Sequence, residues 1–361
     1  MTDAGWEALS NQAVAAAGVV YFLALLALLA ELVFARRVEE PAASANLEAG
    51  SDGPVTVAVG PPAGVDAAED DVRRVAFFGR LGLLLTGLAV TVHAIALITR
   101  GLAADPNRVP WGNMYEFTLS GTFWVALLFL LAVRRFSLAW MAPVVVGLVL
   151  SLLMLGVLVL YTPIAPLTEA LNSPWLVIHV VAAIIATSAF TLGGISSVLY
   201  LLKTRENAAD KGYLARVPDP ADLDRLSYRL HAFAFPIWTF AVLIAGPIWA
   251  YEAWSRYWGW DPKEVWALIT WVVYAAYLHA RATAGWRGRK AAWLALVGVA
   301  TLWFNFVGIN YFSSTSQHSY AAPAGAVVSP VERGTSDFVR NASHTKSLLP
   351  RLSGETAVPA L

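Results

Sequence analysis

The chain of 361 residues contains no cysteine. This absence excludes disulfide bonds, thiolate metal sites and any thiol redox step that the chain itself could carry out. It also excludes a c-type cytochrome, because covalent haem attachment uses a Cys-x-x-Cys-His segment. Charge is scarce as well: 14% of the residues are charged and 58% are hydrophobic, which is more apolar surface than a soluble domain of this size could bury. The net charge is zero, so no overall attraction to nucleic acid is expected.

Hydrophobic residues come in eight blocks of about 20, the length that crosses the hydrocarbon core of a bilayer. Residues 1–37 are expected to hold the first transmembrane helix, retained because the N-terminus lacks the basic start of a signal peptide. Residues 38–74 predict a flexible inner loop and residues 321–361 a flexible outer tail, because both have little to bury. The sequence thus predicts an all-α, polytopic membrane helix bundle with about eight spans, at 14–35, 75–98, 114–133, 138–161, 175–202, 229–251, 262–282 and 291–312.

The distribution of Lys and Arg predicts that the N-terminus and the C-terminus both lie outside. With that orientation, the short outer loops hold four basic residues, Arg100, Arg108, Arg256 and Lys263. Cytoplasmic loops of membrane proteins carry the excess of Lys and Arg, so this imbalance favours the N-out, C-out topology. The inner loops hold 16 of the 25 basic residues: Arg36, Arg37, Arg73, Arg74, Arg134, Arg135, Lys203, Arg205, Lys211, Arg216, Arg225, Arg229, Arg281, Arg287, Arg289 and Lys290.

Six tryptophans crowd into the 23 residues from 249 to 271, which include the end of the sixth block, the connecting loop and the start of the seventh block. Tryptophan favours the membrane–water boundary, and an aromatic belt explains one or two at each end of a span. A belt does not explain this density on a short connecting loop. Dense indoles make a flat apolar surface for a planar aromatic ligand, and each stacked or edge-on contact adds about 0.5–1.5 kcal/mol beyond burial. The pattern favours a ligand platform over a belt, and the six residues are Trp249, Trp254, Trp258, Trp260, Trp266 and Trp271.

The sequence Asp-Pro-Lys-Glu at the start of the seventh block has the pattern of a capping box. Asp261 would be the N-cap, Pro262 the first helical residue and Glu264 the third. Such a cap requires no ligand contact from either carboxylate. The other hypothesis is that Asp261 orients a ligand.

The run from Trp254 to Glu264, WSRYWGWDPKE, closely resembles the tryptophan-rich WWD signature of haem-handling proteins. It looks most like the CcsA/ResC-type subunits of cytochrome c biogenesis system II, called CcsB in some bacteria. The usual glycine after the first tryptophan is Ser255 here, at a position expected to need little bulk. Residues 110–116, PWGNMYE, are similar to the Asn-x-Tyr-Glu element of that family. The resemblance covers about residues 75–320, which it marks as a haem-handling membrane domain with an outer WWD loop at 252–264.

Two histidines are expected to share the outer face with the WWD loop. His179 lies at the outer start of the fifth span, and His318 lies just past the outer end of the eighth. Two imidazoles that flank an aromatic platform suit axial ligation of haem iron from opposite sides. The resemblance implies that this pair holds haem b, with Trp254, Trp258, Trp260 and Asp261 as its surroundings.

His279 lies about 17 residues into the seventh span, roughly 26 Å inward, so it cannot reach the same haem. The resemblance implies a second, deeper haem at His279, with the other ligand from a ResB-type membrane partner. His231 has a similar depth, and a pair within the chain is the alternative. His93 is interpreted mainly as a packing residue, with a role in shaping the haem cavity as the alternative. His344 falls in the tail and is expected to be solvated.

The resemblance implies the haem-handling subunit of a cytochrome c haem lyase or synthase, in the cell membrane or a thylakoid membrane. Haem would pass the region of His279 and be presented at the outer face for thioether bonds with the reduced Cys-x-x-Cys-His segment of apocytochrome c. The protein would contribute positioning, which raises the effective concentration of the reactants, and no catalytic residue can be named. Because the chain has no thiol, a separate pathway must reduce the apocytochrome.

Three other functions are weighed against this one. A system I-like protein would deliver haem to a chaperone without attachment, but the eight spans and His279 favour system II. An electron-transfer cytochrome b would carry two histidines on one helix at the spacing of two stacked haems, and no predicted span has such a pair. A secondary transporter would show inverted repeats, and the sequence has no internal repeat.

Overall fold

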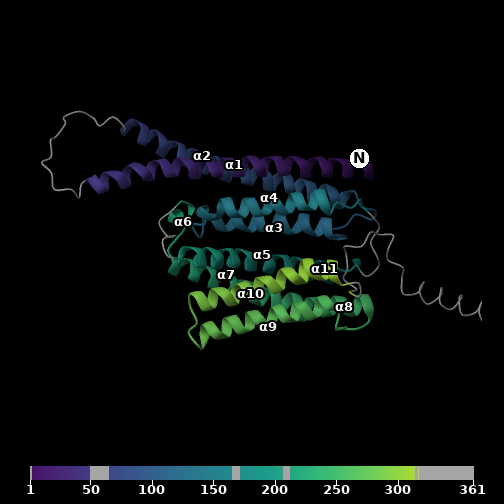
Figure 1. Ribbon diagram of the computed structural model, residues 1–361. Coiled ribbons are helices and arrows are strands. Elements are labelled where there is room, and N and C mark those ends of the chain that lie inside the picture. The colour runs from purple at the N-terminus through teal and green to yellow at the C-terminus, as the bar shows by residue number, and fades with distance from the viewer. Residues whose placement is uncertain (1, 49–64, 165–170, 206–211, 314–315, 317–361) are drawn as a thin grey trace, which may run out of the picture. The chain divides into compact units, whose positions relative to one another are not determined.

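The computed structural model describes residues 2–48, 65–164, 171–205, 212–313 and 316. Within these ranges the ordered elements are helices and there is no strand, which confirms the all-α bundle (Figure 1). The α-helices are α1 (Asp3–Glu48), α2 (Val65–Leu102), α3 (Met114–Val133), α4 (Ala142–Val159), α5 (Pro174–Lys203), α6 (Tyr213–Arg216), α7 (Pro220–Phe240), α8 (Gly246–Trp254), α9 (Pro262–Ala282), α10 (Arg289–Trp303) and α11 (Ile309–Phe312). A 3₁₀ turn, η1 (Ala139–Met141), precedes α4, and π-helical turns join α7 to α8 at η3 (Ala241–Ala245) and α10 to α11 at η4 (Phe304–Gly308).

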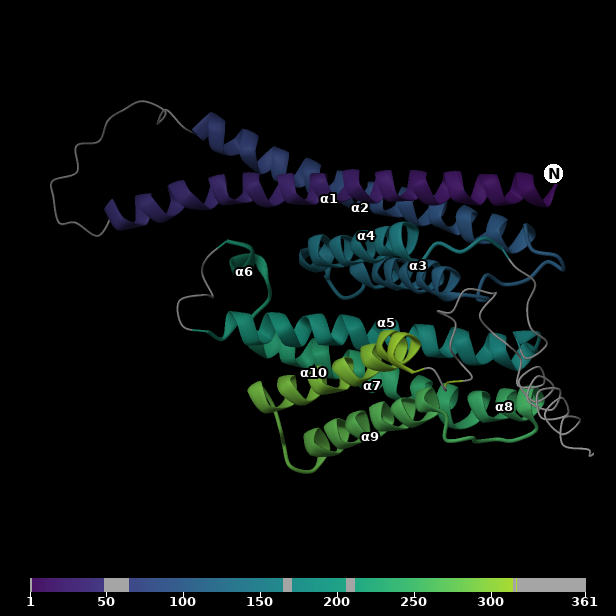
Figure 2. The ribbon, with the colours of Figure 1, turned by 45° about the vertical axis from the view of Figure 1, so that its right-hand side comes forward.

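Seven helical segments among the described residues are long and apolar enough to cross a membrane, and they coincide with seven of the eight expected spans. The exception is α9, whose 21 residues reach about 30 Å but form a less apolar stretch than the other seven segments do. It runs alongside α10 in the bundle (Figures 1 and 2). The chain is therefore a multi-pass membrane protein, and the membrane crossing by α9 stays a prediction.

The inner loop expected over residues 38–74 is shorter than the sequence analysis proposed. Helix α1 continues to Glu48 and α2 begins at Val65, so only residues 49–64 lie outside the described part of this segment. Both extensions are rich in alanine and acidic residues, which favour helix once a neighbouring span has nucleated it. Arg73 adds an ion pair with Glu69 one turn away, at 3.3 Å. The tail expected over 321–361 lies outside the described residues.

The loops predicted to share one face do lie at one end of the bundle. The N-terminus, the turn between α2 and α3, and α8 gather at one end, while α6 and the turn between α9 and α10 lie at the other (Figures 1 and 2). Helices α1 and α2 pack along much of their length, α3 packs on α4, and α5 packs on α7 and α10. This common end holds the candidate site described below.

A buried ion-pair network anchors the α2–α3 turn at that end. The Glu116 side chain is only 1% exposed and accepts hydrogen bonds from Arg100 Nε at 3.1 Å and Arg108 Nη1 at 2.7 Å. Its Oε2 also accepts the backbone N–H of Gly112 at 2.7 Å. Asn113 caps α3 by accepting the Glu116 N–H at 2.9 Å. The Asn-x-Tyr-Glu element is therefore structural, because its carboxylate pairs with two guanidinium groups that would be costly to bury without a counter-charge. Glu7, 3.6 Å from Arg100 Nη1, supplies the second negative charge.

We expect Glu116→Gln to lower the free energy of unfolding by about 3 kcal/mol or more, because it removes the charge between two guanidinium groups and places an amide N–H₂ among donors. Thermal unfolding of the purified protein in detergent measures the effect. The matched control is Glu31→Gln, which weakens the more exposed 2.7 Å pair with Arg216 and should cost about 1 kcal/mol or less. Equal losses in the two variants would contradict the structural role of Glu116.

Candidate functional site

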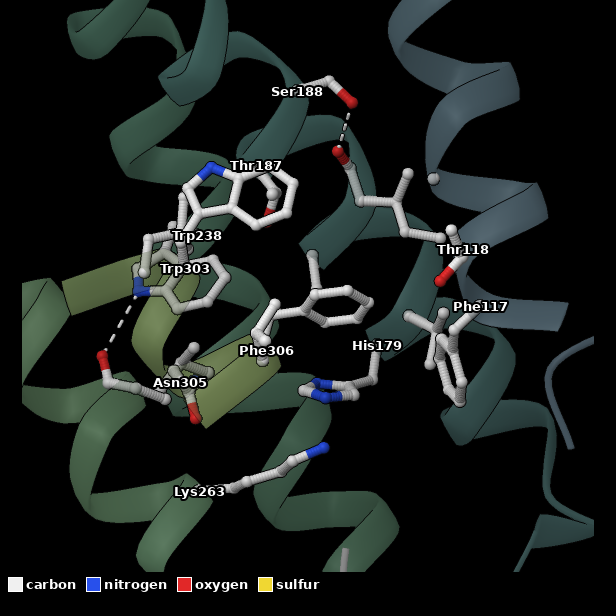
Figure 3. Close-up of a pocket in the computed structure, with 18 of the residues that line it drawn as sticks. Phe117, Thr118, His179, Thr187, Ser188, Trp238, Lys263, Trp303, Asn305 and Phe306 are labelled. Carbon is white, nitrogen blue, oxygen red and sulfur yellow. Dashed lines mark hydrogen bonds between the residues drawn. The ribbon is translucent and has the colours of Figure 1, made fainter. Parts of the chain in front are cut away.

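A cavity of about 280 Å³ opens among α3, α4, α5, α7, α8, α9, α10 and η4 (Figure 3). Its walls are mainly aromatic and aliphatic, with a few polar groups from separate helices. A mostly apolar pocket with a small number of converging polar groups is the usual form of a cofactor site. The residues that matter most for its chemistry are His179, Trp238, Trp258, Lys263, Asn305 and Phe306.

His179 lies in the second turn of α5, and its ring orientation is fixed. Its Nδ1 is 2.8 Å from the carbonyl oxygen of Ala241 in η3. A carbonyl can only accept, so Nδ1 carries the proton and the lone pair lies on Nε2. The ring also stacks on Trp249, with centroids 6.0 Å apart and an interplanar angle of 17°. A hydrogen bond from the second ring nitrogen is what orients metal-ligating histidines, so His179 has the form that an iron ligand requires.

The π-helical turn η3 makes this hydrogen bond possible. Pro247 has no N–H to continue the regular helix ladder, and Gly246 N–H bonds to Ala241 five residues earlier. A Cβ on Gly246 would lie 3.1 Å from both Ala241 O and His179 Nδ1, so the position has little room for a side chain. Turns of this kind often occur at functional sites. The Gly246-Pro247 pair inside a predicted span is the sequence signal for this turn.

The WWD loop distributes its tryptophans over three different environments. Trp258 lines the cavity with His179. Trp254 packs on Trp249, with ring centroids 4.9 Å apart, and so supports the stacking partner of His179. Trp260 is 73% exposed, and its ring is nearly perpendicular to that of Trp258. The platform role of Trp254, Trp258 and Trp260 stays a prediction.

Other aromatic residues of the cavity were not identified from the sequence. Trp238, Trp303 and Phe306 come from neighbouring helices and line the same space (Figure 3). In single spans they could not be told from lipid-facing or packing residues.

Ser255 occupies the end of α8 in a left-handed conformation, with φ 56° and ψ 28°. This is the region that glycine adopts most easily. The backbone angle, rather than limited space for a side chain, therefore explains why glycine is the usual residue here in the family that the sequence resembles.

Asp261 caps α9, which confirms the capping box predicted from the sequence. Its Oδ1 accepts the Lys263 N–H at 2.9 Å, and Glu264 Oε2 accepts the Asp261 N–H at 3.1 Å and the Gly259 N–H at 2.8 Å. The Ser316 hydroxyl also donates to Asp261 Oδ1, at 2.9 Å. A segment that follows α11 is thus bound to the WWD loop. His318, the second expected iron ligand, lies outside the described residues, as does His344.

The deeper histidines lie in contrasting environments. His279 is exposed near the end of α9 that lies away from the cavity, on the same face as Val272. His231 is fully buried, its Nδ1 is 2.6 Å from Ser227 O, and its ring packs between Tyr274 and Tyr277. One imidazole faces outward and the other faces the core, which does not favour a pair within the chain.

His93 is also fully buried, in the core formed by α1, α2 and α3. Its ring makes edge contacts with Tyr21 and Phe123, at centroid distances of 6.1 and 5.7 Å. It is not among the described residues that line the cavity. This placement agrees with a packing residue.

Comparison with known proteins identifies relatives over this region. The sequence model for cytochrome C assembly proteins matches residues 111–316. The chain is 32% identical over 314 residues to the cytochrome c biogenesis protein CcsA of Synechococcus sp. strain JA-2-3B'a(2-13), covering 70% of this chain and 88% of that protein. It is 37% identical over 246 residues to CcsA of Chlamydomonas reinhardtii, covering 66% of this chain and 67% of that protein.

Among solved structures, the cytochrome c haem lyase CcmF superposes with a TM-score of 0.49 and 17% sequence identity. The superposition covers 98% of this chain, which spans about half (52%) of the length of that protein.

The cap assignment for Asp261 predicts a specific order among its variants. Asp261→Asn and Asp261→Ser should keep most activity, because both side chains can accept the backbone hydrogen bond. Asp261→Ala should cost about 1 kcal/mol of local stability and lower the amount of protein in the membrane before it lowers haem per purified protein. Immunoblots and haem assays on the three variants measure both quantities. If Asn and Ser lose haem as severely as Ala while protein levels stay normal, Asp261 contacts the ligand instead.

Proposed function

Because the chain belongs to the cytochrome c assembly protein family, we propose that it binds haem b in the cavity at His179 and presents it for attachment to apocytochrome c. Its role in cytochrome c maturation follows from the family, and the haem chemistry is the proposal. The observation that carries it is the hydrogen bond between His179 Nδ1 and Ala241 O, which places the lone pair of the imidazole on Nε2. Within the aromatic cavity, this nitrogen would act as one axial ligand of haem iron.

The remaining groups of the cavity are proposed to hold and orient the ring system. Trp258, Trp238 and Phe306 offer aromatic faces and edges to a planar ligand. Haem supplies the two vinyl groups that the thiols of the apocytochrome Cys-x-x-Cys-His segment attack. His318 is proposed as the second axial ligand. The contact of Ser316 with Asp261 supports this assignment, because it binds the chain two residues earlier to the WWD loop.

We propose that the cavity end faces the outside of a cell or thylakoid membrane, with both termini outside. The support is the excess of Lys and Arg in the loops at the opposite end. Two ion pairs also order that end: Arg216 with Glu31, and Arg281 with Asp224, each at 2.7 Å.

A ResB-type membrane partner is proposed to bind the exposed face of α9. His279 and Val272 lie on that face, and Val272 is 52% exposed. His279 would then ligate a second haem together with a residue of the partner, as in system II. A separate thiol-reducing pathway completes the system, since the chain has no cysteine.

His179→Ala should remove most of the haem that copurifies with the protein and abolish cytochrome c maturation, while membrane insertion continues. Added imidazole should restore part of both, because it can fill the vacant coordination position. Gly246→Ala is a test that keeps the imidazole but crowds its Nδ1, and it should lower haem affinity by about tenfold. Absorption spectra and haem content measure both variants. Normal haem content in His179→Ala would refute this proposal.

His279→Ala should lower the total haem of the complex with its partner but leave the spectrum of the His179 site unchanged. The expected reason is that His279 serves the deeper haem, at the far end of α9. Val272→Ala, on the same exposed face, is the matched control and should keep full haem content. Unchanged haem in His279→Ala would show that this histidine is not a haem ligand.

A further inference from the structure

One basic side chain enters the cavity beside His179. Lys263 is the only Lys or Arg among the described residues that line it, and Figure 3 shows its ammonium group directed toward the imidazole. It is the second residue of α9, so the capping box fixes its backbone position. From the sequence, Lys263 was recognisable only as part of the cap and as one of the few basic residues in the predicted outer loops.

The two acidic residues next to Lys263 accept hydrogen bonds from the backbone of the loop and of the helix start. Asp261 accepts hydrogen bonds from the Lys263 N–H and the Ser316 hydroxyl. Glu264 accepts them from the N–H groups of Gly259 and Asp261. Both carboxylates therefore hold the loop and the helix start. In the Asp-Pro-Lys-Glu sequence, the lysine is the charged side chain whose end group is directed at the imidazole of the cavity.

An ammonium group in a mostly apolar space interacts strongly with an anion brought into the same space. Water screens it less there than at an exposed surface, and a charge-assisted hydrogen bond adds to the attraction. An uncharged ligand gains neither this attraction nor the charge-assisted hydrogen bond. The cavity thus distinguishes ligands by charge as well as by shape.

We infer that Lys263 binds a carboxylate of the planar ligand in this cavity and so selects acid-bearing ligands over their neutral esters. The inference rests on the proposed function, since haem carries two carboxylates at one edge of its ring. Ligation of the iron by His179 would by itself leave the ring free to turn about the bond between iron and nitrogen. A second contact with one edge removes that freedom and determines which edge faces away from Lys263. Lys263 is therefore a positioning residue.

The test compares haem with haem dimethyl ester, whose two carboxylates are blocked. Both ligands are titrated into the haem-depleted full chain in complex with its partner, and the ratio of the two dissociation constants is measured. We expect the wild type and Lys263→Arg to bind haem about 10- to 100-fold more tightly than the ester, and Lys263→Met to bind the two about equally. Arg256→Met, which removes an exposed cation of the same loop, should keep the wild-type ratio.

Equal affinity of the wild-type protein for haem and ester would overturn the inference without any variant, as would an unchanged ratio in Lys263→Met. Axial ligation is monitored by the absorption spectrum, which should stay that of the His179 site in Lys263→Met. If His179→Ala depletes haem but the ratio does not depend on Lys263, this inference alone fails. If the wild type binds no haem, or His179→Ala binds it normally, the proposed function fails and this inference falls with it.

Discussion

The hydrogen bond between His179 and Ala241 is the interaction on which the arrangement of the site depends. It joins α5 to the helical run formed by α7, η3 and α8. A π-helical turn places the carbonyl where the imidazole can reach it, and the close approach leaves little room for a side chain at Gly246. The same contact sets the tautomer of the imidazole and orients its ring against Trp249. The π-helical turn in the middle of the span therefore determines which ring nitrogen of His179 carries the proton and which carries the lone pair.

Some residues of the WWD loop hold its backbone in place, and others line the cavity. Asp261 and Glu264 bond to backbone donors of the loop, and Ser255 provides the left-handed residue that ends α8. Tyr257, Trp258 and Lys263 line the cavity, and Glu264 both lines it and accepts the backbone hydrogen bonds of the loop. A motif that is continuous in sequence therefore combines a helix cap, a turn and a binding surface.

The sequence predicted the features that depend on local pattern. Long apolar runs gave the helices, because crossing a bilayer requires about 20 such residues, and Asp261 was recognisable as a cap from its three neighbours. His179 was found because the resemblance and the topology placed it beside the WWD loop, at the end of the bundle where the structure has it.

Features that depend on contacts between distant segments could not be predicted in this way. Hydropathy does not show that Glu116 forms ion pairs with Arg100 and Arg108, nor that a π-helical turn presents the Ala241 carbonyl to another helix. The extension of α1 to Glu48 was missed because a polar composition was equated with a loop.

The hydrogen bond from the Ser316 hydroxyl to Asp261 links two elements that are far apart in the sequence. Asp261 Oδ1 accepts both this hydroxyl and the Lys263 N–H, so Ser316 and the start of α9 share one acceptor atom. The position of Ser316 is thereby coupled to the backbone of Lys263, whose side chain lines the cavity.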